Sequence, residues 1–396
     1  MLDGLDIQIL ALVTPQILSD WNITAAAFGP ALGAVVLGTA FGAGVGGWLG
    51  DRFGHRQMLV WTMVVCGIAT AASALTVDVT SLTITRLFSG LAVGAATPNA
   101  LAYVVNWLPE RSRAGFSALA SAYSPAGGVI GSVLVVLVLP TYGWKGCFII
   151  TGAGTLAMAI AMTILLPRRK DIEAHSSLES AELAMREAKR NPTTLFSRAH
   201  LRINIGAPLA FFSLAFLSYS FLAWIPVLMS NAGMTATQAV TASLAFNIMA
   251  LISPFIAGRL IAWQGTRRLM LFAAAAGIAL TILTALAVAS HTASPSPVMR
   301  IVVFCGTGGI GAITALLTAN IYALLTCGYP EECRAKGIGL GMMIGRIGGF
   351  SAIVAGGWLL GSKDGASSLF LLAGIGLIIV AACALLIDRH VLPAAR

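Results

Sequence analysis

Long apolar stretches, separated by short polar or proline-containing turns, fill most of the chain. A helix needs about 20 apolar residues to cross about 30 Å of hydrocarbon, and eleven stretches reach that length. They cover residues 27–50, 57–77, 82–107, 115–139, 146–167, 203–230, 237–262, 268–290, 298–327, 338–361 and 367–387. A shorter twelfth stretch, residues 1–18, precedes them. The pattern predicts an all-α membrane protein with twelve transmembrane helices.

The composition of the 396 residues supports this prediction. It is 58% hydrophobic and only 10% charged, against about 25% charged residues in a soluble domain, which excludes a soluble enzyme, a disordered chain and a secreted disulfide-rich module. The six cysteines are scattered, mostly inside apolar stretches, so we expect neither a disulfide nor a metal site. No cluster of His, Cys or Ser indicates a reaction, and we expect a non-enzyme without a cofactor.

The basic residues indicate how the chain crosses the membrane. Of the 24 Lys and Arg residues, 19 fall in alternate loops and the C-terminal tail, two in the opposite loops and three within spans. Cytoplasmic loops carry the excess of Lys and Arg, so both termini are predicted to be cytoplasmic. The net charge of +9 is then a matter of topology, and we expect the lipid bilayer but no nucleic acid as a partner.

An internal repeat divides the chain into two halves. A shift of 211 residues aligns Pro15 with Pro226 and Gly54 with Gly265, and a shift of 221 aligns Asn99 with Asn320. The repeat predicts two six-helix halves, residues 1–167 and 203–396, joined by a cytoplasmic linker over 168–202. Halves of the same orientation are typical of a transporter that rocks around a site between them.

The repeat also bears on the N-terminus. The partner of the span that begins near residue 203 should begin about eight residues before Met1, so we expect the first helix to be truncated at its inner end. Asp3 and Asp6 then align with Leu214 and Leu217, in the middle of a span. Two carboxylates three residues apart share one helix face, and each costs roughly 2.5–3.5 kcal/mol at membrane depth. They are candidates for proton coupling; the alternative is a pair of N-terminal acids in water.

A Gly-rich loop joins the second and third spans with the sequence GWLGDRFGHR, residues 47–56. Its glycines permit a tight turn, and Asp51 can pair with Arg56 or Arg113 to hold one conformation closed. The second copy has Ala262 in place of Asp51, which predicts a weaker gate. The expected gating residues are Gly47, Asp51, Arg52, Gly54, Arg56 and Arg113.

Two arginines within spans are candidates for function. Arg346 lies nine residues into its span, where it needs an anionic partner, and a substrate carboxylate fits its planar fork of donors. Pairing to a helix-end carbonyl is the alternative. Arg86 begins the fourth span and is either an interfacial anchor or a counter-charge to the acids of the first span. Arg300 lies near a span end, within reach of water, and is assigned no function.

These motifs together resemble the aromatic acid:H+ symporter family of the major facilitator superfamily. The resemblance rests on residues 3–6, the loop 47–56, Arg86 with Gly90, Gly94, Pro98 and Asn99, residues 224–226 and residues 345–348. It implies a major facilitator fold in the inner membrane of a bacterial cell, benzoate-like substrates, and roles in transport for Asp3, Asp6, Gly47, Asp51, Gly54 and Arg86. Two departures are Asn106, where members commonly have Glu, and the absence of a tail before the first span.

The sequence therefore predicts a transporter that imports a small aromatic carboxylate with protons by alternating access. The expected partners are these two solutes, and the expected state is a monomer. The expected substrate-binding residues are Arg346, Arg86, Asn99, Asn320, Tyr219 and Trp224, and further candidates for contact with an aromatic ring are Tyr123, Phe212, Phe216, Phe221 and Tyr322. The alternatives are a proton-antiporting exporter of drugs or metabolites and an inactive remnant or sensor.

Overall fold

The computed structural model describes residues 2–105, 123–166, 200–293, 296–329, 331–361 and 365–391. Within these ranges all regular structure is helical, which confirms the predicted all-α fold. The elements are α1 (Leu2–Trp21), α2 (Ala25–Phe53), α3 (His55–Ala72), η1 (Ser73–Leu75), α4 (Val79–Val105), α6 (Tyr123–Leu165), α8 (Leu201–Asn231), α9 (Ala236–Ala293), α10 (Pro297–Gly328), α11 (Glu331–Leu360) and α12 (Gly365–Leu386).

Two of these helices each contain two predicted spans. The backbone of α6 leaves the helical conformation at Gly143 (φ 62°), and that of α9 leaves it at Gly265 (φ 75°). Residues with a Cβ rarely adopt a positive φ, so glycine is the residue that fits such a break. Divided at these glycines, the ten described α-helices supply the twelve spans that the sequence predicts.

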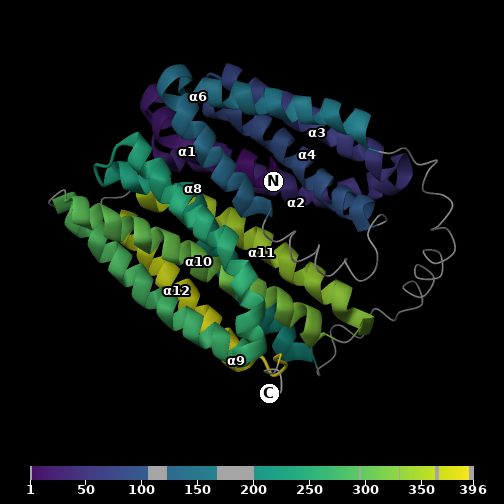
Figure 1. The fold of residues 1–396 in the computed structure, drawn as a ribbon, viewed down its shortest axis with the longest axis vertical. Coiled ribbons are helices and arrows are strands. Elements are labelled where there is room, and N and C mark those ends of the chain that lie inside the picture. The colour runs from purple at the N-terminus through teal and green to yellow at the C-terminus, as the bar shows by residue number, and fades with distance from the viewer. Residues whose placement is uncertain are drawn as a thin grey trace.

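The helices form two bundles (Figure 1). Helices α1 to α6 pack together in one bundle, and α8 to α12 pack together in the other. The main contacts between the bundles join α2 to α11, α6 to α9 and α1 to α8. The boundaries 1–167 and 203–396 remain predictions, since the expected linker 168–202 lies, apart from its last three residues, outside the described part of the chain.

Close contact between α2 and α4 depends on small residues. A Cβ at Gly42 would collide with the backbone of Leu91, and one at Gly94 would collide with the backbone of Thr39. Glycine at both positions lets the two backbones approach closely. Helices in a membrane often associate through such small residues, because the lipid is as apolar as the helix side chains.

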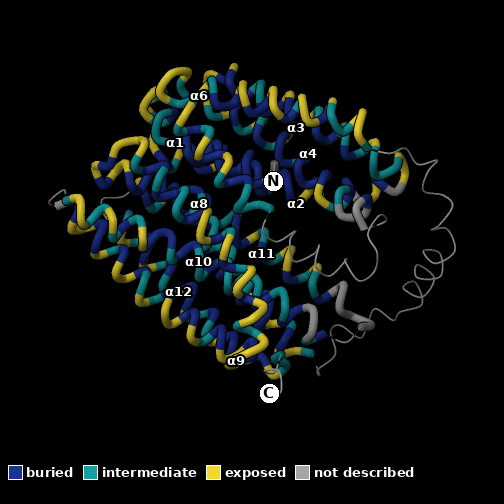
Figure 2. The backbone as a smooth tube through the Cα atoms, in the orientation of Figure 1, coloured by how far each residue is buried: buried dark blue, intermediate teal, exposed yellow. Residues whose placement is uncertain are grey.

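The surface away from the bundle interface is apolar. Large exposed side chains include Trp61, Phe88, Leu137, Phe272 and Leu371, and exposed positions run along the outer faces of both bundles (Figure 2). A soluble protein rarely exposes so extensive an apolar surface, and the side chains at this surface suit contact with lipid.

The turn after the break in α9 binds the end of α12. Thr266 N–H donates to Val391 O, and Val391 N–H donates to the Thr266 side-chain Oγ1, each at 3.0 Å. His390 Nε2 donates to Ala384 O at 3.0 Å, which leaves Nδ1 to accept from Thr266 Oγ1 at 3.1 Å. The chain after α12 is thereby attached to the inner turn of its own bundle.

The glycine contact between α2 and α4 predicts an effect on stability. Gly42→Leu forces the helices apart and should lower the free energy of unfolding by about 1–3 kcal/mol, the usual cost of overpacking. The matched control is Gly44→Leu, because a Cβ at Gly44 meets nothing within 4 Å. Melting of the detergent-purified protein, followed by tryptophan fluorescence, should show a lower Tm for the first variant only. Equal melting temperatures would contradict the proposed packing role.

Attachment of the chain after α12 should depend on pH. Burial lowers the pKa of His390 below its ordinary 6.5; Arg267 adds to this, while the Ala384 carbonyl and Asp388 oppose it. Because the folded-state pKa lies below the unfolded one, the attachment is stable above about pH 6.5 and weakens as the pH falls through that value. Trypsin should then cleave after Arg389 faster at pH 5.5 than at pH 7.5, relative to a free peptide of the same sequence. His390→Gln should abolish this difference.

Candidate functional site

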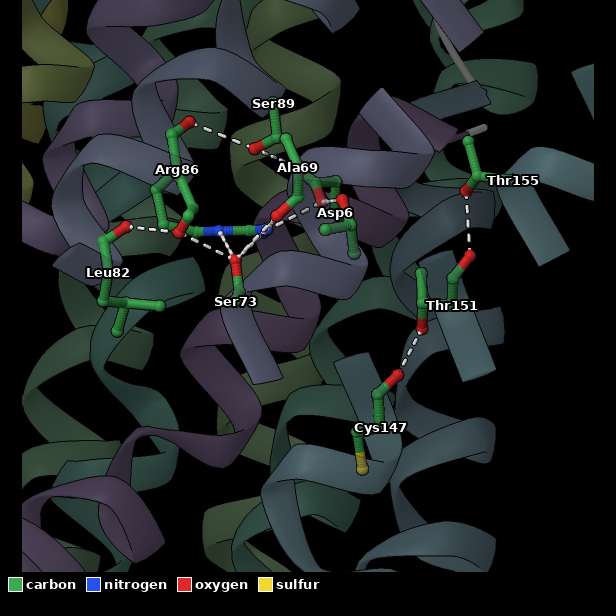
Figure 3. Close-up of polar contacts among 11 residues, drawn as sticks. Asp6, Ala69, Ser73, Leu82, Arg86, Ser89, Cys147, Thr151 and Thr155 are labelled. Carbon is green, nitrogen blue, oxygen red and sulfur yellow. Dashed lines mark hydrogen bonds and ion pairs between the residues drawn. The ribbon is translucent and has the colours of Figure 1, made fainter. Parts of the chain in front are cut away.

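An ion pair lies at the centre of the first bundle. The carboxylate of Asp6, on α1, contacts Arg86 Nη1 of α4 at 3.0 Å, and their side chains are only 3% and 0% exposed. Thr70 of α3 donates to Asp6 Oδ1 at 2.8 Å, and Ser89 of α4 donates to Oδ2 at 2.9 Å (Figure 3). The expected role of Arg86 as a counter-charge to an acid of the first span is confirmed in its geometry.

The remaining donors of Arg86 also have partners. Nε and Nη2 donate to Ser73 Oγ at 3.1 and 2.7 Å, and Nη2 lies 3.4 Å from Ala69 O. The guanidinium carbon is 5.0 Å from the centre of the Phe148 ring, on the second half of α6, a distance at which a cation is attracted to the ring face. Ser73 reaches the pair because α3 ends in the 3₁₀ turn η1.

Such a pair responds strongly to loss of either charge. Removing one partner of a buried ion pair costs about 3–5 kcal/mol, because the other charge stays buried without compensation. Protonation of Asp6 would have the same consequence for Arg86, whose other hydrogen-bond acceptors here are neutral oxygens. The side chain of Asp3 lies outside the described part of the chain.

A second cationic site lies between the two bundles. Arg346 of α11 is half-buried, and its Nη1 is 3.3 Å from Thr39 Oγ1 of α2 and 3.4 Å from Tyr219 OH of α8. Thr39 belongs to the first bundle, whereas Tyr219 belongs to the second. The guanidinium thus contacts hydroxyls of both bundles, at the place where a site for alternating access is expected.

Two tyrosines lie near Arg346, and further aromatic side chains lie on α8. Tyr322 of α10 lies within electrostatic range of both Arg346 and Tyr219, and its ring contacts Phe211 edge-on at 5.3 Å between centroids. Also on α8, Phe212 stacks on Phe216, one helical turn later, with 6.4 Å between the ring centroids. The rings of α8 approach α11 at its glycines, since a Cβ at Gly349 would lie 2.7 Å from the Tyr219 ring. A cation beside aromatic rings suits an aromatic anion.

The contacts between α2 and α11 are unevenly distributed. A Cβ at Gly357 would lie 2.8 Å from Ala25 O, one at Gly33 would touch Phe350, and Thr39 contacts Arg346. Beyond Thr39, toward the loop 47–56, the side chains of Phe41, Val45 and Trp48 are 67%, 53% and 60% exposed. These contacts of α2 with α11 thus lie between Ala25 and Thr39, and the three exposed side chains lie beyond them.

The loop between α2 and α3 contacts the end of α6. Gly54 has φ 91° and its N–H donates to Gly50 O at 2.8 Å, which confirms the predicted tight turn. Arg56 donates to Leu166 O at 2.9 Å and to Thr163 O at 2.6 Å, at the end of α6. Arg52 lies 5.7 Å from the rings of Trp48 and of Phe53.

Several expected residues of this loop are not described. The side chain of Asp51, the environment of Gly47, and the whole of Arg113 and Asn106 lie outside the described part of the chain. The expected pairing of Asp51 with Arg56 or Arg113 therefore remains a prediction, although Arg56 is already bound to two carbonyls of α6.

Three residues expected to bind substrate have other partners. Asn99 donates to Gly46 O and Ala95 O, both at 2.8 Å, and its Oδ1 is 2.8 Å from His55 Nδ1, so it joins α4 to the inner loop. Its repeat partner Asn320 is fully buried and donates to Thr266 O at 3.3 Å. Trp224 is fully buried and donates to Ile353 O at 3.0 Å within the second bundle. These contacts place the three residues at the ends and in the core of the bundles, and their expected role in substrate binding remains a prediction.

Sequence reasoning missed the hydroxyl groups at both cationic sites. Thr70, Ser73 and Ser89 complete the Asp6–Arg86 network, and Thr39 contacts Arg346. A signal was present for the first group, because Ser73 and Thr70 lie one turn apart near the end of a span, as do Arg86 and Ser89. Thr39 had no such signal, since its neighbour Arg346 lies 307 residues away.

Comparison with known proteins agrees with this architecture. The model of the Major Facilitator Superfamily matches residues 1–350. The gallate transporter of Pseudomonas putida is 26% identical over 98% of this chain and 89% of its own, and a 4-hydroxybenzoate transporter of Pseudomonas putida is 26% identical over 91% and 84%. The crystal structure of a D-xylose-proton symporter superposes with a TM-score of 0.74 at 17% identity, covering 99% of this chain and 95% of that one.

These relatives are transporters rather than enzymes, and none of the described contacts suggests a reaction centre. The family match extends over well more than half of the 396 residues, and the spans, the repeat and the solved fold agree with it. The chain is a multi-pass membrane transporter that belongs to the major facilitator superfamily.

Proposed function

We propose that this transporter imports a small aromatic carboxylate, such as a hydroxybenzoate, together with protons. The observation on which the proposal rests is the position of Arg346, half-buried between the two bundles and surrounded by Tyr219, Tyr322 and Thr39. A guanidinium binds a carboxylate through two parallel hydrogen bonds, and the neighbouring rings offer faces and edges to an aromatic ring.

The names of the relatives support the same class of substrate. Gallate and 4-hydroxybenzoate both combine a carboxylate with a hydroxylated ring. In our proposal Arg346 and Tyr219 bind the carboxylate end. Arg86, by contrast, acts through Asp6, and Asn99, Asn320 and Trp224 act in the framework around the site.

Proton coupling is assigned to the acids of α1. With Asp6 ionised, its pair with Arg86 holds α1 against α3 and α4; with Asp6 protonated, Arg86 loses its anionic partner and the network of hydroxyls rearranges. Asp3, one turn earlier on the same helix, is proposed as the second acid. If both acids carry a proton, two protons and one carboxylate anion move a net charge of +1 inward, and each net positive charge gains about 2.3 kcal/mol per 100 mV of membrane potential.

The inner loop is proposed to act as a gate. Gly47, Asp51, Arg52, Gly54, Arg56 and Arg113 are the residues we assign to it. Arg56 already joins the start of α3 to the end of α6, so a conformational change that moves α6 must involve this loop. We further propose a monomer in the bacterial inner membrane with both termini on the cytoplasmic side, in keeping with the distribution of basic residues.

The substrate proposal is tested by replacing Arg346. Arg346→Gln keeps a polar side chain but removes the charge, and it should weaken binding of 4-hydroxybenzoate at least tenfold, since hydrogen bonds to charged groups contribute about 1.5–3 kcal/mol. Calorimetric titration of purified protein measures this affinity. Arg300→Gln, on α10 outside the proposed site, is the matched control and should bind as the wild type does. Unchanged binding by Arg346→Gln would contradict the proposed site.

The coupling proposal is tested by separating exchange from accumulation. Asp6→Asn should abolish uphill uptake of labelled 4-hydroxybenzoate driven by a pH gradient in proteoliposomes, while exchange of labelled for unlabelled substrate continues. Asp20→Asn, an exposed acid at the other end of α1, should accumulate substrate normally. Accumulation by Asp6→Asn would contradict coupling through this residue, and accumulation driven only by an opposite gradient would favour an exporter.

The ion pair itself predicts a non-additive effect on stability. Asp6→Asn and Arg86→Met should each lower the free energy of unfolding by about 3–5 kcal/mol, because each leaves one buried group without its partner. The double variant should recover most of that loss, since it leaves neither charge. A double-mutant cycle of melting curves measures the coupling, and additive losses would contradict the pairing.

A further inference from the structure

The side chain of Gln8 on α1 is buried without any hydrogen bond. It is 1% exposed, and neither its Nε2 nor its Oε1 has a partner among the described residues. A buried polar group without a partner costs about 1–3 kcal/mol, and Gln8 has two donor hydrogens and an acceptor oxygen. A group of this kind calls for a ligand that supplies the missing partners.

Gln8 faces away from the Asp6–Arg86 network. Gln8 lies two positions after Asp6, which corresponds to about 200° around a helix of 3.6 residues per turn. Asp6 contacts α3 and α4. Gln8 instead lies beside the first half of α6, where a Cβ at Gly131 would be 3.7 Å from the Gln8 Cβ.

The internal repeat shows where this position lies relative to Arg346. The shift of 211 residues that aligns Pro15 with Pro226 also aligns Gln8 with Tyr219, whose hydroxyl contacts Arg346 at 3.4 Å. Gln8 precedes the end of α1 by 13 residues and Tyr219 precedes the end of α8 by 12, so both lie about 20 Å from those ends. Equivalent positions of the two halves lie at the same depth on opposite sides of the axis that relates them.

We infer that Gln8 is a specificity-determining residue that binds a ring hydroxyl of the aromatic acid held by Arg346. The inference rests on the proposed function. The amide and a phenolic hydroxyl each both donate and accept, so they satisfy one another. The substrate then has its carboxylate on the second bundle and its hydroxyl on the first, and it joins the two bundles when both ends are bound.

This arrangement predicts selection for hydroxylated rings. A site built to hydrogen-bond a hydroxyl discriminates against the analogue that lacks it, because the buried amide would stay unpaired. Benzoate leaves Gln8 without a partner, whereas 4-hydroxybenzoate supplies one. Removing the amide should therefore remove the preference between these two acids and should leave the affinity for benzoate unchanged or slightly higher.

The test compares the two acids on purified full-length protein by calorimetric titration. Gln8→Met keeps the length of the side chain and should lower the ratio of 4-hydroxybenzoate to benzoate affinity about tenfold, which corresponds to about 1.4 kcal/mol. The matched control is Gln16→Met on the same helix. Gln16 Oε1 is also buried without a partner among the described residues, but Gln16 borders a separate cavity with Leu12, Pro15 and Ser230, and the ratio should not change there.

The outcomes separate this inference from the proposed function. Wild-type protein that binds neither acid would overturn the proposed function itself. If the wild type binds both acids through Arg346 and Gln8→Met has the same ratio of 4-hydroxybenzoate to benzoate affinity, the inference alone is overturned. The Gln8 amide would then bind water instead of substrate. If Gln8→Met fails to fold, Gln8→Asn replaces it, because this variant keeps the amide on a side chain shorter by one methylene. An unchanged ratio of 4-hydroxybenzoate to benzoate affinity in Gln8→Asn would likewise overturn the inference.

Discussion

The hydrocarbon interior contains no water, so every charge at that depth must find its partner within the protein. The first bundle meets this constraint at Asp6 and Arg86 with a direct ion pair and with hydroxyls from three elements. Much of the local architecture serves the pair. The turn η1 brings Ser73 under the guanidinium, and the glycine contact of α2 with α4 holds Ser89 in a tightly packed helix.

The second cationic site handles the same constraint differently. Arg346 is half-buried between the bundles and contacts neutral hydroxyls of Thr39 and Tyr219, so its partners change whenever the bundles move. Asp6 and Arg86 lie within one bundle and are satisfied by it alone. One half therefore contains a charge pair that a proton can break, and the other provides a cation that a bound anion can neutralise.

Much of the fold could be predicted from the sequence because span length and the distribution of Lys and Arg reflect the bilayer directly. The repeat predicted equivalent turns, and Gly54 and Gly265 do share a positive φ although Asp51 and Ala262 differ between the copies. The contacts of the candidate site residues were predicted less well. Asn99, Asn320 and Trp224 are polar or amphipathic groups at plausible depths, but their partners are backbone carbonyls of neighbouring elements, and spacing along one chain does not reveal such contacts. Arg346 could be identified because an arginine so far from a span end has few alternatives.

The attachment of Val391 to Thr266 has a consequence for how this protein can be observed. The two hydrogen bonds hold Val391 against the turn after Gly265, so a fluorophore attached at Val391 would stay close to the second bundle. Paired with a second fluorophore on the turn between α2 and α3, it would report the distance between the two bundles at that end and any change in it.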